Sequence, residues 1–260
     1  PPDAPAFQCY NFSRPIPGPY SEASEALIMS EENKRVLVVL AHPDDPEFFC
    51  GATLAKWARQ GKEIDYLLLT CGDKGSDSPE VTPEMLCADR KVEQRAAADA
   101  LGVREIKFLS FPDGELANSN QVRREIVREI RRKRPFAVVT SDPTAYIRAN
   151  GINHPDHRAA GAATLDAVFP AAGNRMYFPE LLSEGFEPFY PREIWLSIPN
   201  EPTEWVNVTD TIDVKLAALR AHKSQIKDMD ALEKRIRERL RRPDVVGEFY
   251  AEAFRVIRFP

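Results

Sequence analysis

The sequence has no long apolar segment and no excess of positive charge. No stretch approaches the roughly 18 consecutive apolar residues that a membrane-spanning helix needs, so we expect no membrane span. Acidic side chains outnumber basic ones over the 260 residues, and the formal net charge is −5. Proteins that bind nucleic acid present a basic face to the phosphates, so the composition predicts no nucleic-acid partner.

Cysteine is scarce, and its spacing follows no recognised pattern. The four cysteines are Cys9, Cys50, Cys71 and Cys87, with no C-x-x-C among them. We therefore predict reduced thiols rather than a disulfide framework. The first 30 residues also lack the basic and then apolar pattern of a secretory signal peptide. Together these features favour a cytoplasmic protein.

Glycine patterns that bind nucleotide phosphates are missing as well. No G-x-G-x-x-G follows the first expected strand, and the loop 72–76 (G-D-K-G-S) resembles a phosphate-binding loop only loosely. Acidic residues directly after that strand would repel a pyrophosphate. A nucleotide-binding Rossmann-like module is therefore kept only as an alternative hypothesis.

What the chain does have is a regular alternation of strands and helices. Six of the first 19 residues are proline, so we predict an N-terminal arm, 1–34, before a single domain, 35–260. A homo-oligomer in which the arm packs on another copy is left open. Within the domain, apolar runs typical of buried strands alternate with amphipathic helices. The expected strands are 35–41, 64–70, 106–110, 136–140, 194–197 and 204–208, and the expected helices are 51–60, 83–101, 120–132, 155–168, 212–225 and 231–241. This order predicts an α/β fold: a Rossmann-like, mostly parallel sheet with helices on both faces.

Ligands of such sheets bind beyond the carboxyl ends of the strands, and two histidine clusters lie there. His-Pro-Asp-Asp, residues 42–45, follows the first expected strand, and His-Pro-Asp-His, residues 154–157, follows the fourth. These clusters contain three of the four histidines in the chain. One His-Pro-Asp at a helix start is ordinarily a capping arrangement. Two copies at two strand ends favour a functional site.

The clusters contain the ligand types that zinc prefers. Catalytic zinc takes three protein ligands, imidazole nitrogen or carboxylate oxygen, and keeps a fourth position for water. His42, Asp45 and His157 supply such a set, and we predict one Zn²⁺ per chain.

The remaining residues of the two clusters have the chemistry of a hydrolase. We expect Asp44 to act as general base on a metal-activated water. His154 would face the substrate and, as an imidazolium, stabilise an oxyanion or protonate the leaving amine. Asp156 would orient His154 and keep it charged.

The two clusters also carry a family resemblance. A-H-P-D-D, residues 41–45, with G-A-T-L-A, residues 51–55, resembles the opening motif of the LmbE-like deacetylases, which include the N-acetylglucosaminyl-phosphatidylinositol de-N-acetylases. H-P-D-H-R, residues 154–158, resembles their second motif. The resemblance implies a Rossmann-like fold, a mononuclear zinc site and the same residue roles as those given above.

Weaker matches extend the resemblance. Arg90 and Glu93 resemble a family pattern whose arginine reaches a substrate hydroxyl or phosphate, and Asp113, in an Asp-Gly turn, resembles a residue that binds sugar hydroxyls. A helix-surface ion pair and a turn without a ligand are equal alternatives. His222, in A-H-K-S-Q, also resembles a family segment, and we interpret it as a structural or rim histidine.

The chain departs from the family at two positions. Pro46 and Glu47 stand where many members have a glutamate directly after the aspartates, and Ile152 replaces a tyrosine of the mycothiol-type enzymes. Oxyanion stabilisation then rests on zinc and His154, or on another tyrosine such as Tyr146. The predicted function is removal of an N-acetyl group from a small amino-sugar-type substrate. A metal-dependent hydrolase of another acyl or ester substrate is the alternative.

Overall fold

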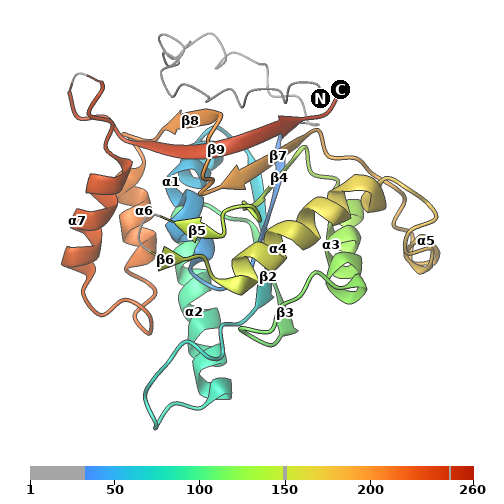
Figure 1. Cartoon of the computed structure of the whole chain (residues 1–260), viewed down its shortest axis with the longest axis horizontal. Helices are drawn as coiled ribbons and strands as arrows, with labels where there is room; N and C mark the ends of the chain where they lie inside the picture. The colour runs from blue at the N-terminus through green and yellow to red at the C-terminus, as the bar shows by residue number, and fades with distance from the viewer. Residues whose placement is uncertain (1–32, 149–150, 246) are drawn as a thin grey trace, which may run out of the picture.

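The structure is a computed structural model that describes residues 33–148, 151–245 and 247–260. Apart from its last two residues, the predicted N-terminal arm 1–34 lies outside the described residues, as does Cys9. The rest of the chain forms an α/β fold around one large sheet with helices on both faces, as predicted (Figure 1).

The sheet has seven strands in the order β3-β2-β1-β4-β7-β9-β8. Neighbours from β3 to β7 are parallel, whereas β9 is antiparallel to both of its neighbours. A separate two-stranded hairpin, β5 with β6, precedes the second histidine cluster. The strands are β1 (Arg35–Leu40), β2 (Glu63–Thr70), β3 (Glu105–Phe111), β4 (Ala137–Ser141), β5 (Ile147–Arg148), β6 (Gly151–Ile152), β7 (Glu193–Ser197), β8 (Glu204–Asn207) and β9 (Ala251–Arg258).

Helices cover the two faces of the sheet in separate groups. The first group consists of α1 (Asp45–Arg59), α2 (Pro83–Leu101), α6 (Ile212–Leu219) and, outermost, α7 (Met229–Leu240). The second consists of α3 (Asn120–Lys133), α4 (Pro155–Asp166), the distorted helical segment η3 (Ala167–Ala172) and the short α5 (Glu180–Ser183). Alternate residues of β1 enter the two resulting cores, which is why its apolar run is continuous. No helix in the described ranges is long and apolar enough to cross a bilayer.

Two helices differ clearly from the sequence-based expectation, and one long strand is additional. Helix α1 begins at Asp45 instead of Gly51, with Pro46 and acidic residues in its first turn, which are ordinary helix-start signals. Helix α6 ends at Leu219, so the predicted helical residues 220–225 form turns. Strand β9 was not expected at all.

The prediction of reduced cysteines is wrong for two of them. Cys71, directly after β2, and Cys87, in α2, form a disulfide with Cα atoms 5.2 Å apart. They are 16 positions apart in sequence, so the absence of C-x-x-C said nothing about their distance in the fold. Cys50 is a free, buried thiol, and burial raises its pKa. Cysteine usage therefore no longer supports the predicted cytoplasmic location.

Candidate active site

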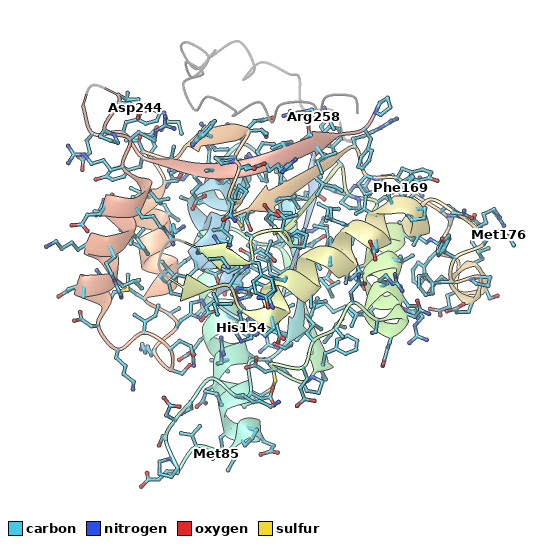
Figure 2. All side chains as sticks on the ribbon, in the orientation of Figure 1. Met85, His154, Phe169, Met176, Asp244 and Arg258 are labelled. Carbon is cyan, nitrogen blue, oxygen red and sulfur yellow. A yellow bond between two sulfur atoms is a disulfide. The ribbon has the colours of Figure 1, made fainter. Side chains whose placement is uncertain are left out.

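The carboxyl ends of β1 and β4 lie side by side at the point where the strand order reverses. The chain goes from β1 to β2 on one side and later returns to β4 on the other, which makes this the topological switch point of the sheet. The ring of His42, after β1, lies 4.8 Å from that of His154 and 5.2 Å from that of His157. The structure therefore brings the two distant histidine clusters together. Figure 2 shows His154 at the amino end of α4, beside the hairpin.

The carboxylate of Asp45 lies between two of these imidazoles. Its Oδ1 is 3.0 Å from Nε2 of His157, and its Oδ2 is 3.4 Å from Nδ1 of His42. Zinc bonds of about 2.0–2.1 Å in a tetrahedron place neighbouring ligand atoms roughly 3.3 Å apart. Asp45 therefore contacts both predicted histidine ligands, at distances close to this spacing.

His42 has two further carboxylates on its other side. Its Nε2 lies 3.0 Å from Asp113 Oδ1 and 3.3 Å from Asp156 Oδ2. These three residues form one cluster whose ligand atoms are close enough to hold a cation, and His42, His154 and His157 form another. We expected Asp156 to orient His154, but its carboxylate faces His42 and accepts hydrogen bonds from the backbone amides of Gly114, at 2.7 Å, and Leu116, at 3.2 Å. Only its backbone N–H contacts His154.

The two carboxylate groups around His42 face different nitrogens of its ring. A metal-binding histidine commonly donates its other ring N–H to a carboxylate or carbonyl oxygen. Nε2 of His42 faces Asp113 and Asp156 as such a donor, which leaves Nδ1 directed at Asp45. His157 has the matching arrangement, because its Nδ1 lies 3.1 Å from Oδ1 of Asn153 and its Nε2 faces Asp45.

Charge around His42 strongly favours a cation. Burial lowers the pKa of His42, but the charge of Asp45 and the hydrogen bonds to Asp113 and Asp156 outweigh burial and raise it to about 12. Burial would raise the pKa of Asp45, yet His157 and His42 hold it well below its usual value. The centre therefore contains an ionised carboxylate between two imidazoles, a donor set suited to a divalent metal.

Asp44, the predicted base, directly precedes Asp45 at the start of α1. It caps the amino end of α1 in a left-handed conformation, with φ of 90°. Its Oδ2 lies 3.3 Å from Nη2 of Arg90. Burial raises the pKa of Asp44 to about 7, although the charge of Arg90 opposes this. A carboxylate that titrates near neutral pH suits general base catalysis.

The two predicted substrate-binding residues each contact another residue of the site. Arg90 is buried in α2 and donates to the backbone carbonyls of Gly72 and Pro43 in addition to its ion pair with Asp44. Asp113 is buried against His42. Contact of either side chain with a substrate stays a prediction.

His154 differs from the charged form that we expected. It is the exposed N-cap of α4, extended as Pro155 requires, and its Nδ1 accepts a hydrogen bond of 3.2 Å from the backbone N–H of Asp156. Burial, followed by the like charges of His42 and His157, holds the pKa of His154 below its usual value. The structure therefore favours a neutral ring whose Nε2–H remains available as a donor.

Two residues of the site went unnoticed in the sequence. Gln94 accepts a hydrogen bond from the backbone of Asp44, and Asn153 contacts His157. Gln94 lies four residues after Arg90 on a predicted helix, and therefore on the same helix face. That spacing was the available signal.

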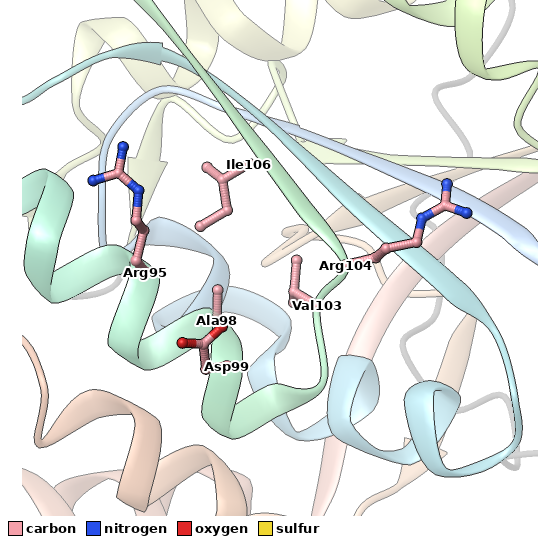
Figure 3. Close-up of a pocket in the computed structure, with 6 residues that line it drawn as sticks. All are labelled: Arg95, Ala98, Asp99, Val103, Arg104 and Ile106. Atoms are coloured by element: carbon pink, nitrogen blue, oxygen red, sulfur yellow. The ribbon is translucent and has the colours of Figure 1, made fainter.

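A hollow of about 200 Å³ between α2 and β3 is separate from this centre (Figure 3). None of the predicted site residues lines it. Its lining consists of Arg95, Ala98, Asp99, Val103, Arg104 and Ile106.

Known proteins match this chain over a region that includes both histidine clusters. The profile of the family described as GlcNAc-PI de-N-acetylase (PIG-L) matches residues 37–168. The chain is 36% identical over 192 residues to a diacetylchitobiose deacetylase from Thermococcus kodakarensis, covering 74% of this chain and 70% of that protein. It is 28% identical to a 1D-myo-inositol 2-acetamido-2-deoxy-alpha-D-glucopyranoside deacetylase from Kineococcus radiotolerans, covering 77% of this chain and 72% of that protein.

A solved structure extends the likeness to the fold. The N,N'-diacetylchitobiose deacetylase from Pyrococcus horikoshii, complexed with its inhibitor MPG, matches with a TM-score of 0.80 and 30% identity, over 86% of this chain and 84% of that one. The profile match spans both histidine clusters, and the strand-end geometry is that of one site. The chain therefore belongs to the GlcNAc-PI de-N-acetylase (PIG-L) family of N-deacetylases.

Proposed function

We propose that this protein is a zinc-dependent hydrolase that removes the N-acetyl group from a small amino-sugar substrate, such as an N-acetylglucosamine derivative. The observation that carries the proposal is the convergence of His42, Asp45 and His157 beside Asp44 at the switch point of the sheet. The names of the two relatives give different substrates and have a deacetylation in common. The class of substrate is therefore proposed, and a particular sugar is not.

The zinc ligands in this proposal are His42, Asp45 and His157. Asp113 and Asp156 would accept the hydrogen bond from Nε2–H of His42. Asn153 would accept the one from Nδ1–H of His157. When bound, zinc supplies a Lewis acid that polarises a carbonyl and lowers the pKa of a coordinated water to roughly 7.

The protein's own groups then move the protons. Asp44 accepts a proton from the attacking water, and the Arg90 guanidinium keeps its carboxylate oriented. The Nε2–H of His154 donates to the carbonyl oxygen as negative charge develops there. Asp44 returns the proton to the leaving nitrogen as the C–N bond breaks. One water is consumed, and the products are acetate and a free amine.

We assign oxyanion stabilisation to His154, whose ring lies beside those of His42 and His157, with Tyr146 as the alternative. The ring of Tyr146 lies beneath the guanidinium of Arg158, 3.7 Å from ring centroid to Cζ. At the position of the missing family tyrosine, Ile152 is 76% exposed at the hairpin. We further propose Arg90 and Asp113 as the groups that meet sugar hydroxyls.

The test is a substrate panel with Asp44→Asn as the matched variant. Zinc-loaded protein is expected to release acetate and a primary amine from N-acetylglucosamine or N,N'-diacetylchitobiose. Asp44→Asn should lower kcat by about 10²–10⁴-fold while the zinc content stays the same. Hydrolysis of an acetate ester or a phosphate ester, without any amine release, would favour the alternative hydrolase instead.

A further inference from the structure

Three side chains that the proposed mechanism does not use lie together behind Asp44. Gln94 in α2, Glu47 in α1 and His222 after α6 are all fully buried. They come from three separate parts of the sequence, and among the residues that the structure describes none of the three bonds to the side chain of a proposed zinc ligand. Their contacts lead to the backbone of Asp44.

Asp44 has a backbone conformation that needs support. Its φ of 90° lies in the left-handed region, which residues other than glycine rarely adopt. Such a conformation persists where surrounding contacts over-determine it. Arg90 engages the carboxylate of Asp44, and Oε1 of Gln94 accepts a hydrogen bond of 2.7 Å from its backbone N–H. The side chain and the peptide of Asp44 are therefore held from the same face of α2, one helical turn apart.

The amide of Gln94 has only one favourable orientation. Its Nε2 donates to both carboxylate oxygens of Glu47, at 3.0 and 3.1 Å, while its Oε1 faces the N–H of Asp44. Reversing the amide would set its oxygen against a carboxylate and its NH₂ against an N–H donor. Glu47 therefore fixes the orientation of the group that holds Asp44.

Glu47 is fixed in turn by donors from two other elements. Nε2 of His222 lies 3.2 Å from Oε2 of Glu47, and the hydroxyl of Tyr66 in β2 lies 3.5 Å from Oε1. All of these groups are buried. A buried carboxylate needs such partners, because losing one leaves it without compensation in a medium of low polarity.

The segment that carries His222 is anchored to α2 by a residue adjacent to Gln94. Both the backbone N–H and the hydroxyl of Ser224 donate to the carboxylate of Glu93, at 2.7 Å each. The family-like pairs Arg90–Glu93 and His222–Ser224 thus belong to one assembly rather than to two separate motifs.

We propose that Gln94 is a positioning residue for the reaction, and that Glu47 and His222 hold it in place. Gln94 fixes the peptide of Asp44 and thereby aims the carboxylate of the general base. The inference rests on the proposed role of Asp44. Its substrate-independent part is the chain of hydrogen bonds from His222 through Glu47 and Gln94 to Asp44.

The first test replaces the amide with an apolar side chain of similar length, Gln94→Met. We expect kcat to fall about 10–100-fold with KM within threefold, because a displacement near 1 Å at a reacting group costs about 10²-fold in rate. Zinc content, measured by elemental analysis, should remain that of the wild type. Arg95→Met, at an exposed site on the same helix, is the control and should leave kcat unchanged. Ile130→Ala, in the core of the opposite sheet face, controls for lost stability.

A reciprocal exchange provides the second test. Gln94→Glu places two carboxylates in contact and should slow turnover at least tenfold. Adding Glu47→Gln restores one carboxylate and one amide, with their positions exchanged. The carboxylate at position 94 then accepts from the backbone N–H of Asp44, and the amide at position 47 donates to that carboxylate. The double variant should recover kcat to within about fivefold of the wild type.

Several results would overturn the proposal. A folded Gln94→Met protein with kcat within twofold of the wild type would do so, as would one that loses zinc in proportion to its activity. If Gln94→Met does not fold, the reciprocal exchange decides. A folded double variant whose kcat is no higher than that of Gln94→Glu counts against the proposal, and so does a double variant that fails to fold. A wild type that deacetylates nothing refutes the proposed function instead, which is a distinguishable outcome.

Discussion

Asp45 and Asp156 lie on opposite sides of His42, and removing the charge of either should affect zinc binding to a different extent. We predict that Asp45→Asn abolishes stoichiometric zinc binding, whereas Asp156→Asn only weakens it. Asp45 presents oxygens to both imidazoles, at 3.0 and 3.4 Å. Asp156 reaches only Nε2 of His42, which in our assignment is the nitrogen that carries hydrogen.

The expected size of the Asp156→Asn effect follows from its contacts. Its carboxylate accepts hydrogen bonds from the backbone amides of Gly114 and Leu116 and faces His42. An asparagine keeps one acceptor oxygen and turns an NH₂ donor towards another donor. Removing a partner that orients a metal ligand typically lowers metal affinity 10–100-fold, or about 1.4–2.7 kcal/mol.

Competition with a chelator measures both variants on one scale. Zinc-loaded proteins are titrated with a chelator of known affinity, and thermal unfolding of the chelated forms controls for misfolding. The reasoning is refuted if Asp45→Asn keeps zinc near the wild-type affinity while Asp156→Asn loses it. In that case the metal would belong to the cluster of His42, Asp113 and Asp156.

Three further predictions concern stability. Replacing Cys71 and Cys87 with serine should lower the free energy of unfolding by about 3 kcal/mol in urea, the value for a loop of this length. The hydrogen bond from Lys133 helps to lower the pKa of Glu105 to about 2 from 4.5, so its stabilising charge is present above pH 4.5 and is lost as the pH falls to 2. In Glu105→Gln, the loss of unfolding free energy between pH 4.5 and 2 should be smaller than in the wild type. The difference should be less than about 1 kcal/mol, because the ion pair is partly exposed. Gly161→Ala would place a Cβ 2.2 Å from a backbone oxygen of β4 and should cost on the order of 1–3 kcal/mol by calorimetry.

The parallel part of the fold was predictable because the local spacing of apolar residues reflects which faces of each strand and helix are buried. The run 35–41 is apolar throughout because β1 has a core on each face. The bounds of α2 agree with the expectation because Thr82 caps its start and Gly102 ends it in a left-handed conformation. The position of the site followed from the parallel sheet, which gathers the ends of non-adjacent segments at one edge.

Features that depend on distant contacts were not predictable in this way. Strand β9 escaped notice because Glu252, within its alternating pattern, is buried beside Lys215, with Oε1 and Nζ 2.6 Å apart. A buried charge interrupts the apolar pattern, and only its partner from α6 explains it. The disulfide and the contact between Gln94 and Asp44 have the same origin, since each joins residues whose proximity arises in the fold.

The charge of the site gives a reason for cation binding that does not depend on family membership. Four carboxylates gather around His42, namely Asp44, Asp45, Asp113 and Asp156. Arg90 pairs with Asp44 alone, on the side facing α2. Burying this much negative charge is costly unless a positive group lies within it, and the carboxylates around His42 raise its pKa to about 12. A divalent cation at Nδ1 of His42 would replace the ring proton there with twice its charge, so zinc affinity should rise with pH as the imidazole gives up its proton.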